Sequence, residues 1–589
     1  MARPPGLTHR GISAPVEAKA KLTQILLTNA NGNAIILRMF TRGFSTAFLL
    51  LALTASTASA VAAPPTDGTP YLDRSGPTAR LMVDGKPFLI LGGELRNSST
   101  SSLDYMEPIW PRMAAAKFNT LLAVTTWEQV EPQEGKFDFS LVDAAIDGAQ
   151  KSGLHLVFLW FGSWKNGISS YEPAWVKSDM KRFPRVQDAQ GTNLEILSAF
   201  SNANRDADAR AYAALMKHIH QVDSKHTVLM MQVENESGIL GNTARDHSAE
   251  AEAAWKKPVP DALMNFLTKN KAQLQPEFLD VWARTGFKTK GMWAEVFGDS
   301  QRAEEIFEAW QYSQYIDAVA GAGKAEYAIP MYVNTWITQY TGEPGGEHPS
   351  GGSVSRVLDV WLAGISHLDV VAPDIYLPDL RGVLASYDHL GNPLLIPETR
   401  NGAAGGANAL YAFGQGVFGF SPFAVDQAAE SENSALGAAY RVLDQLTPLL
   451  TSLDKSKMAS VVRQEGDAKA AVELDGYLLR IQYEGVTARG AGGGAATNGA
   501  ATTPSGAALI INTAPDEFIV AAEGVTVNFL PNSKGPQQVS MVSVEEGTFN
   551  NGVWVPGRRL NGDETNSNDH LIFRGGTPTL QKVKLYRHD

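Results

Sequence analysis

Cysteine is absent from the 589 residues of this sequence. That absence excludes disulfide bonds, thiolate nucleophiles and zinc sites built on cysteine ligands. Histidine offers no substitute, because the eleven histidines show no HExxH motif or comparable ligand spacing. We therefore expect neither a metal nor another cofactor.

Positive charge is in deficit. The chain has 50 Lys and Arg against 62 Asp and Glu, a formal net charge of −12. Binding a nucleic-acid backbone requires clustered Lys and Arg, so the composition argues against DNA or RNA as a partner. With 44% hydrophobic and 19% charged residues, the chain has the composition of a globular protein. Its length predicts more than one domain.

Residues 1–63 are expected to hold an upstream extension and an export signal. Arg38 and Arg42 precede an apolar run at 44–53, and small residues follow up to Ala60. This order is typical of a secretory signal peptide, here at 39–60. The run is short for a bilayer span, although a membrane anchor is the alternative. We predict translation from Met39 and export to a bacterial periplasm or the outside, with no membrane span in the mature chain.

Short apolar runs alternate with amphipathic helical patterns over residues 64–453. This alternation favours an α/β fold with a parallel sheet, and eight units predict a (β/α)8 barrel (TIM barrel). The largest insertion is expected at 241–299, between the fourth and fifth strands. The predicted strands are 88–91, 119–124, 155–160, 228–233, 330–334, 368–372, 394–397 and 417–420. The predicted helices are 106–117, 141–151, 207–222, 303–320 and 354–365.

Residues 454–589 have a different pattern. Helical periodicity fades and short, turn-bounded strands replace it, which predicts a C-terminal β-sandwich. The predicted strands are 459–463, 470–483, 508–512, 518–520, 538–544 and 571–573.

Two glutamates follow barrel strands that lie across the barrel mouth from each other. Glu236 ends a Gln-Val-Glu-Asn-Glu stretch after the fourth strand, and Glu398 follows the seventh in Pro-Glu-Thr-Arg. Cleavage of a glycosidic bond requires one carboxylic acid and one carboxylate on opposite sides of the anomeric carbon. Arg400 would favour ionisation of Glu398 if its side chain turned toward it. Spacing alone leaves Glu234 as an alternative to Glu236, because simple alternation points both to one side of a strand.

These residues resemble the retaining glycosidase barrels of clan A, and most closely glycoside hydrolase family 35, the β-galactosidases. That family has a Gln-x-Glu-Asn-Glu stretch whose second Glu is the acid/base, which carries over to Glu236. Its seventh-strand nucleophile carries over to Glu398. Gly93-Glu94, Trp127 to Pro132 and Gly135 to Phe139 match further motifs. The resemblance covers about residues 80–425. The chain is similar to a bacterial subgroup of the family that has a C-terminal β-domain.

Two positions depart from the family pattern. Glu128 stands where Asn is usual, and the third-strand signature is replaced by a stretch that runs from Trp164 to Gly167. The sugar-binding residues are therefore less closely matched than the catalytic pair. We expect the substrate-binding residues to come from strand exits, with core packing or structural ion pairing as the alternative for the tryptophans, Glu94 and Glu128. The candidates are Asn235, Glu94, Trp127, Glu128, Trp164, Asn334, Trp336 and Tyr376.

The resemblance implies an exo-acting β-galactosidase that releases terminal β-linked galactose from plant-type glycans by double displacement, with xyloglucan side chains as a candidate substrate. The alternatives are another retaining clan-A glycosidase, such as a family 42-like enzyme or an endo-glucanase or mannanase, and a non-catalytic glycan-binding protein. The sequence does not determine the oligomeric state.

Overall fold

The computed structural model describes residues 23–28, 34–39, 65–428, 430–485 and 505–589. Two units are formed, Met1–Ala63 and Pro64–Asp589. In the first, β1 (Thr23–Thr28) pairs antiparallel with β2 (Ala34–Met39). Apart from Met39, the predicted signal peptide lies outside the described residues, so the signal, the start at Met39 and export stay predictions.

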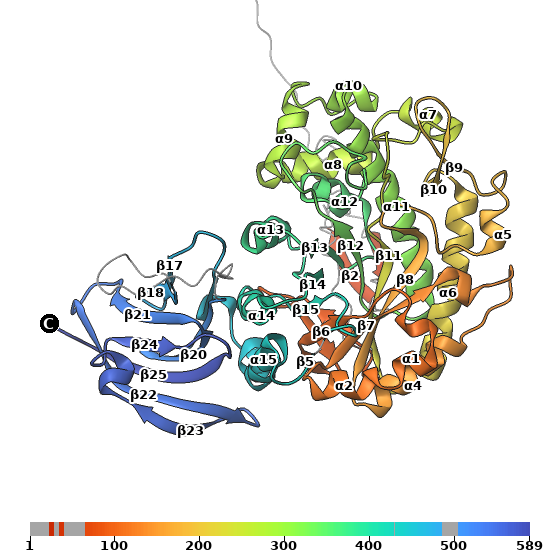
Figure 1. Cartoon of the computed structure of the whole chain (residues 1–589). Helices are drawn as coiled ribbons and strands as arrows, with labels where there is room; N and C mark the ends of the chain where they lie inside the picture. The colour runs from red at the N-terminus through yellow and green to blue at the C-terminus, as the bar shows by residue number, and fades with distance from the viewer. Residues whose placement is uncertain (1–22, 29–33, 40–64, 429, 486–504) are drawn as a thin grey trace, which may run out of the picture. The chain divides into compact units, whose positions relative to one another are not determined.

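Eight parallel strands close into a barrel in the second unit (Figure 1). The predicted barrel is confirmed, and each predicted strand corresponds to one of its strands. In order, they are β6 (Ile90–Glu94), β7 (Thr120–Thr126), β8 (His155–Lys165), β11 (Val228–Asn235), β12 (Met331–Trp336), β13 (Val370–Ile375), β14 (Ile396–Thr399) and β15 (Gly419–Pro422).

The strands read as continuous apolar runs because both of their faces are buried. In β7, Leu122 and Val124 belong to the cluster inside the barrel, whereas Leu121 and Ala123 belong to the cluster under the helices. A small sheet of β3 (Tyr71–Asp73), β4 (Arg80–Val83) and β5 (Lys86–Phe88) adds apolar side chains from β4 to the inner cluster. The barrel is therefore a filled core whose polar chemistry is confined to its rim.

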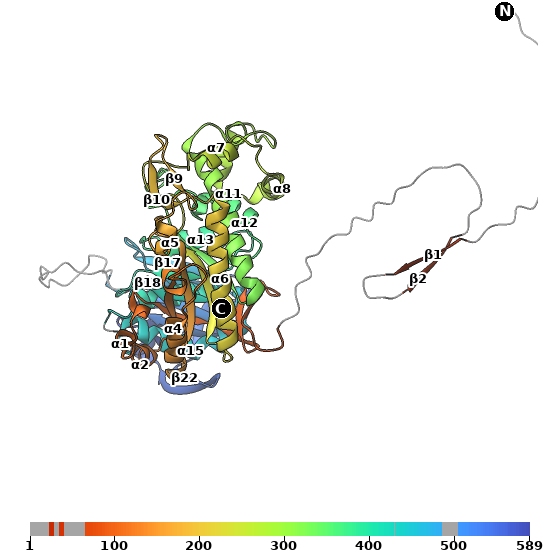
Figure 2. The same ribbon diagram turned by 90° about the vertical axis from the view of Figure 1, so that its right-hand side faces the viewer.

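Helices cover the barrel, and the two longest, α6 (Asn202–Val222) and α11 (Gln301–Glu326), lie side by side (Figure 2). Gly323 of α11 lets them approach closely, since a Cβ there would lie 2.3 Å from the Tyr212 ring. The other principal helices are α2 (Ile109–Ala115), α4 (Ser140–Lys151), α12 (Leu358–Gly364), α13 (Leu380–Tyr387), α14 (Gly405–Gly414) and α15 (Ala435–Ser452).

Two helices begin in the structure at residues other than those predicted. The helix expected at 106–117 is divided into α1 (Leu103–Met106) and α2, with Pro108 in the break. Proline lacks the backbone N–H that a continuous helix would use there. The helix expected at 354–365 opens with a 3₁₀ turn, Ser355–Val357, before α12 begins.

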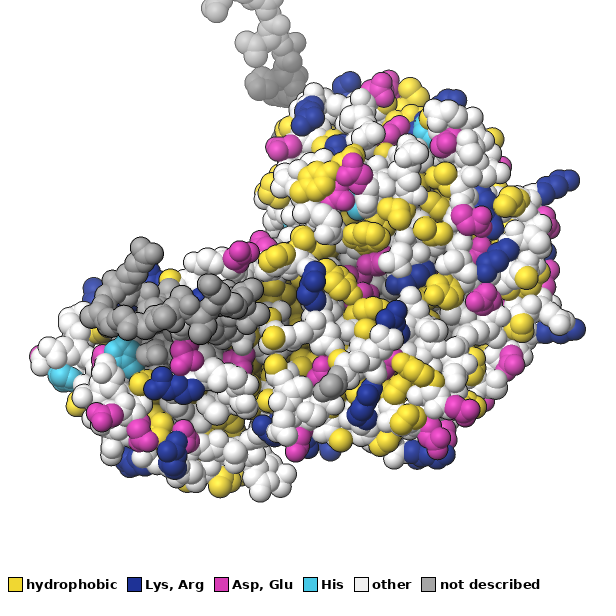
Figure 3. Space-filling model, viewed as in Figure 1, with side chains coloured by type: hydrophobic (Ala, Val, Ile, Leu, Met, Phe, Trp, Pro, Cys, Tyr) yellow, Lys and Arg dark blue, Asp and Glu magenta, His cyan; other side chains and the backbone are white. Residues whose placement is uncertain are grey.

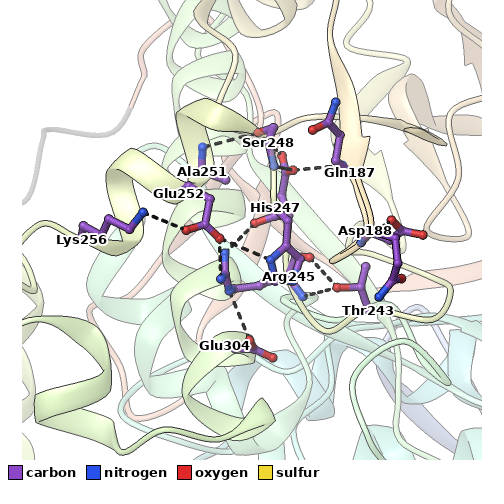
Figure 4. Close-up of polar contacts among 12 residues, drawn as sticks. Gln187, Asp188, Thr243, Arg245, His247, Ser248, Ala251, Glu252, Lys256 and Glu304 are labelled. Carbon is purple, nitrogen blue, oxygen red and sulfur yellow. Dashed lines mark hydrogen bonds and ion pairs between the residues drawn. The ribbon is translucent and has the colours of Figure 1, made fainter. Parts of the chain in front are cut away.

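The insertion predicted at 241–299 is helical. It contains α7 (Ala249–Trp255), α8 (Asp261–Asn270), α9 (Pro276–Ala283) and α10 (Trp293–Phe297). Arg245 joins it to the barrel helices: its guanidinium bonds Glu252 of α7 at 2.6 Å and Glu304 of α11 at 3.2 Å (Figure 4). The insertion is thus anchored by paired charges.

The C-terminal β-sandwich is confirmed. One sheet has the order β16 (Met458–Val462), β19 (Ala507–Ala514), β20 (Glu517–Glu523), β25 (Thr579–His588), β22 (Gln538–Asn550) and β23 (Val553–Leu560). The other has the order β17 (Lys469–Leu474), β18 (Tyr477–Tyr483), β21 (Val525–Pro531) and β24 (His570–Phe573). Three strands, β21, β23 and β25, were not predicted.

Helices α14 and α15 join the sandwich to the barrel. Leu509 and Ile519 of the six-stranded sheet share one apolar cluster with Leu410 of α14 and Leu443 of α15. The Ser460 hydroxyl donates to the Tyr411 carbonyl at 2.9 Å. Acidic and basic side chains are interspersed on the face shown in Figure 3. Within the described residues, no helix is both long and apolar enough to span a membrane.

Candidate active site

Acidic side chains gather where the parallel strands end, at one rim of the barrel. Glu94 is the last residue of β6, Glu236 directly follows β11, Asp374 lies in β13 and Glu398 lies in β14. All four are buried, with exposed fractions between 1% and 6%. We call these four residues the mouth cluster.

The two predicted catalytic glutamates face each other. One carboxylate oxygen from each of Glu236, Asp374 and Glu398 lies within 4.8 Å of the other two. Asp374 and Glu398 are directly paired between β13 and β14. Retaining glycosidases hold their carboxyl groups about 5–5.5 Å apart, whereas inverting enzymes need about 6.5–9.5 Å to admit a water. The spacing fits direct attack by one of these carboxylates.

The backbone decides between Glu234 and Glu236. Both have left-handed φ angles, +64° and +45°, and the β8–β11 register shifts at this point. Simple alternation therefore fails here, and the two side chains diverge. Glu234 accepts the backbone N–H groups of Ser163 and Trp164 at 3.1 and 2.8 Å. Glu236 joins Asp374 and Glu398 instead.

Asparagines hold Glu236 in place. Asn166 Nδ2 donates to Glu236 Oε2 at 2.7 Å. Asn334 Oδ1 accepts from the Glu236 backbone N–H at 3.0 Å, while Asn334 Nδ2 donates to Asp374 Oδ2 at 2.8 Å. Asn334 thus lies within the site, and in this structure it links two carboxyl-bearing strands.

Burial gives Glu236 the protonation behaviour of an acid that works near neutrality. It raises the pKa of Glu236 to about 7, with the charge of Lys165 acting to lower it and that of Glu398 acting to raise it. Burial and the nearby Glu398 charge also hold the pKa values of Glu94 and Asp374 well above their usual range. A carboxyl group that keeps its proton at neutral pH can donate it to a leaving group.

Glu398 is held by Tyr376, one of the candidate substrate-binding residues. The Tyr376 hydroxyl donates to Glu398 Oε1 at 2.5 Å. Glu398 Oε2 is buried and has no hydrogen-bond partner. Arg400, expected to favour ionisation if it turned inward, instead donates to the Tyr376 carbonyl at 3.3 Å. Tyr376 therefore orients one oxygen of Glu398 and leaves the other free to react.

Three candidate substrate-binding residues pack against or bond residues outside the mouth cluster. Trp127 is fully buried, with Nε1 bonded to Glu131 and its ring edge-on to Trp175. Trp164 packs between Tyr312 and Tyr315. Glu128 forms an ion pair with Lys177 at 3.2 Å. Core packing engages the two tryptophans and an ion pair engages Glu128, which were the alternatives expected for them, and a sugar contact from these residues stays a prediction.

The other candidates lie at the rim. Trp336 ends β12 beside Asp374 and is half-buried. Glu94 is close enough to Glu398 for the charge of Glu398 to raise the pKa of Glu94. Asn235 is buried, with Oδ1 bonded to Lys165 Nζ at 2.9 Å and Nδ2 unpartnered. These groups, with Asn334 and Tyr376, surround the two glutamates.

Sequence reasoning missed Lys165, Asn166 and Asp374. Asp374 had a usable signal, because it lies two residues before Tyr376 at the end of the sixth strand. Lys165 and Asn166 belong to the third-strand stretch that departs from the family 35 pattern. They approach Asn235 and Glu236 through an extension of β8 that the apolar pattern did not reveal.

The three close carboxylates are also the one group in the described chain with a spacing able to hold a metal ion. A Ca²⁺ ion takes six to eight oxygen ligands. The ammonium of Lys165 acts on the same cluster, which disfavours a second cation there. The donor set fits proton transfer better than metal binding.

Two family models match separate segments. Residues 102–282 match a β-galactosidase model, that of glycoside hydrolase family 42, and residues 436–572 match a domain of unknown function (DUF5597). A β-galactosidase of Xanthomonas manihotis is 29% identical over 211 residues, 35% of this chain and 32% of that protein. The chain thus matches about a third of that relative's length.

Solved structures resemble this chain only remotely. The β-galactosidase of Bacillus circulans sp. alkalophilus has a TM-score of 0.42 at 14% identity, covering 62% of this chain and 57% of that one. The catalytic domain of a Paenibacillus polymyxa β-amylase has a TM-score of 0.40 at 13% identity, covering 60% and 97%. These likenesses are too distant to indicate an activity. The β-galactosidase model that matches this chain is that of family 42 and not that of family 35, to which the motifs were assigned.

Proposed function

We propose that the protein is a retaining glycoside hydrolase of the β-galactosidase type. The observation that carries the proposal is the close approach of Glu236 and Glu398, within 4.8 Å at the rim of a closed barrel. The matches to a β-galactosidase model and to a β-galactosidase relative support the sugar. The segment that matches the β-galactosidase model, residues 102–282, contains Glu236 but not Glu398, so the assignment of Glu398 rests on geometry.

The first step forms a glycosyl ester. Glu398 Oε2, buried and free of hydrogen bonds, attacks the anomeric carbon as a carboxylate. The bond from that carbon to the leaving oxygen breaks, and Glu236 transfers its proton to that oxygen. Tyr376 keeps its hydrogen bond to Oε1 of the nucleophile. The charge created on the leaving group is thereby neutralised as it develops.

The second step releases the sugar. Glu236, now a carboxylate, takes a proton from water while the water oxygen attacks the anomeric carbon. The ester bond breaks and Glu398 leaves as a carboxylate. Two inversions give net retention. Because Glu236 serves as acid and then as base, a pKa near 7 suits both steps.

Several buried polar atoms around the pair suit a polyhydroxylated ligand. Within the described residues, atoms without a partner at this end of the barrel include Glu94 Oε1, Asn235 Nδ2 and Asp374 Oδ1. Buried polar groups normally have hydrogen-bond partners, and sugar hydroxyls can act as donors and acceptors. The finer proposal is an exo-acting enzyme that removes terminal galactose, with xyloglucan side chains as the first glycan to test.

A panel of aryl β-glycosides tests the proposal. We expect the galactoside to be hydrolysed faster than the glucoside and mannoside, with the β-anomer of galactose as the first product by NMR. A first product of α configuration would overturn the nucleophile assignment. Galactosylated xyloglucan oligosaccharides should then lose single galactose units, whereas internal cleavage would indicate an endo-acting enzyme. Tight binding without turnover of any glycoside would indicate a glycan-binding protein.

A further inference from the structure

The end of β8 holds the segment that carries Asn235 and Glu236. Strand β8 has eleven residues, and its last residue, Lys165, is paired in register with Asn235. Directly after it, Asn166 has a left-handed φ of +54° and the Gly167 N–H donates to the Glu236 carbonyl at 2.9 Å. Residues 165–167 therefore contact the proposed acid/base segment through side chains and backbone.

Lys165 determines which way the Asn235 amide faces. Lys165 Nζ lies 2.9 Å from Asn235 Oδ1. An ammonium group has donors and no acceptor, so it can bond only the oxygen of an amide. The nitrogen, Asn235 Nδ2, must then face the other way, and it is buried without a partner. An amide whose orientation is ordinarily ambiguous has a single satisfactory orientation here.

We propose that Lys165 is a positioning residue that fixes Asn235 so that Nδ2 donates a hydrogen bond to the hydroxyl oxygen beside the anomeric carbon of the sugar. The inference rests on the proposed function. It defines a substrate class, sugars with a neutral hydroxyl at C2. A protonated amino group at C2 offers no acceptor to Nδ2 and would meet a second cation in Lys165.

The charge of Lys165 has a second effect, on Glu236. The groups acting on Glu236 are Lys165 from β8, Asp374 from β13 and Glu398 from β14. Glu94 from β6 is subject to the charges of both Glu398 and Lys165. The ammonium also lies 5.1 Å from the centre of the Phe161 ring. Because Lys165 is the cation in this set, its removal should raise the pKa of Glu236.

The test compares an aryl β-galactoside with its 2-deoxy analogue. For Lys165→Met, we expect kcat/KM on the 2-hydroxy substrate to fall about 10- to 100-fold, the range for losing one oriented hydrogen bond. On the 2-deoxy substrate the fall should be within about 3-fold, because the contact is already missing there. The alkaline limb of the pH profile should move upward. Lys165→Arg, which keeps a donor-only cation, should restore part of the difference between substrates.

Lys177→Met is the matched control. Lys177 bonds Glu128 and the Ser170 carbonyl on the surface, so this variant should behave like the wild type on both substrates. Lys165→Gln is a second variant, which keeps a polar side chain should Lys165→Met fold poorly. Because Gln can donate or accept, it leaves the Asn235 amide free to rotate. Like Lys165→Met, it should lose more kcat/KM on the 2-hydroxy substrate than on the 2-deoxy substrate.

The proposal would be overturned if, in both Lys165→Met and Lys165→Gln, kcat/KM fell as much on the 2-deoxy substrate as on the 2-hydroxy substrate and the alkaline limb of the pH profile did not move. That result would show a purely structural role for Lys165. The proposal would also be overturned if the wild type hydrolysed a 2-amino substrate as fast as the 2-hydroxy substrate. A wild-type enzyme inert toward every aryl glycoside would overturn the proposed function itself, and this inference with it. The two failures are therefore distinguishable.

Discussion

Two regions of this protein bury acidic side chains, with opposite consequences. In the mouth cluster, burial and the charge of Glu398 hold the pKa values of Glu94 and Asp374 well above their usual range. Glu305 of α11 is equally buried, at 1% exposure. Burial acts to raise the pKa of Glu305, yet His348 and Arg356 outweigh it and the pKa lies below its usual value.

The difference lies in the counter-charges. The Arg356 guanidinium bonds both oxygens of Glu305 at 2.9 Å, and His348 Nε2 lies 2.8 Å from Oε1. Arg245 is likewise compensated, because it forms ion pairs with Glu252 and Glu304 (Figure 4). In the described part of the chain, Lys165 is the cation that acts on Glu94 and Glu236 of the mouth cluster, which holds four carboxyl groups. Buried charge that is compensated fixes structure, whereas buried charge that is left uncompensated keeps protons available for chemistry.

Removing the nucleophile should have the largest effect. Glu398→Ala should lower kcat by about 10⁴-fold or more, because no other group can form the glycosyl ester. Its melting temperature should be equal to or above that of the wild type, since one of four crowded carboxyl groups is lost. Azide added to this variant should enter the vacated space and yield the α-glycosyl azide, as NMR can show. Formation of the β-azide would assign Glu398 the acid/base role instead.

Removing the acid should have an effect that depends on the leaving group. Glu236→Ala should lose about 10²- to 10⁴-fold on galactosides of poor leaving groups and far less on activated aryl galactosides. Glu234→Gln is the comparison, since Glu234 accepts backbone N–H groups of β8 and not a substrate proton. Its loss should be the same for every leaving group. A leaving-group dependence in Glu234→Gln and none in Glu236→Ala would reverse the assignment.

The sequence predicted the barrel well because its strands are buried on both faces and have distinct apolar runs. Strand exits concentrate chemistry in this fold, which made Glu236 and Glu398 candidates, and the family resemblance then preferred Glu236 to Glu234. The edge strand β23 was missed because most of its residues are exposed, and Val553 alone is 66% exposed. An exposed edge strand has no apolar alternation to detect.

The side-chain directions at the mouth could not be predicted. Two left-handed residues, Glu234 and Glu236, separate side chains that alternation would place together. Trp127 follows β7 and Trp164 lies near the end of β8, where sugar-stacking residues are found, but their rings pack against helix residues, a choice that depends on tertiary packing. Lys165 was missed because nothing in a local pattern indicates that β8 continues to meet Asn235.

Breaking the compensated region should affect stability and leave the chemistry intact. Arg356→Met leaves Glu305 buried without the guanidinium that bonds both of its oxygens and should cost about 3–5 kcal/mol in the free energy of unfolding. Denaturant unfolding measures this cost, and kcat of the folded fraction should stay within about 2-fold of the wild type. Arg302→Met is the control, because Arg302 also reaches Glu305, at 3.3 Å, but is partly exposed. Its cost should be about 1 kcal/mol or less.

The smallest perturbation is a change of pH, which alters the mouth cluster without a mutation. Glu236 must be protonated to act as the acid, and its pKa is raised to about 7. Proton loss above that pH removes the acid, so kcat/KM should fall about tenfold per pH unit on the alkaline side. In Glu236→Ala with an activated aryl galactoside, the same limb should disappear, because no group then has to hold that proton. If the limb persists unchanged in that variant, it belongs to another member of the mouth cluster, and Glu94 and Asp374, both held neutral by burial, are the next groups to substitute.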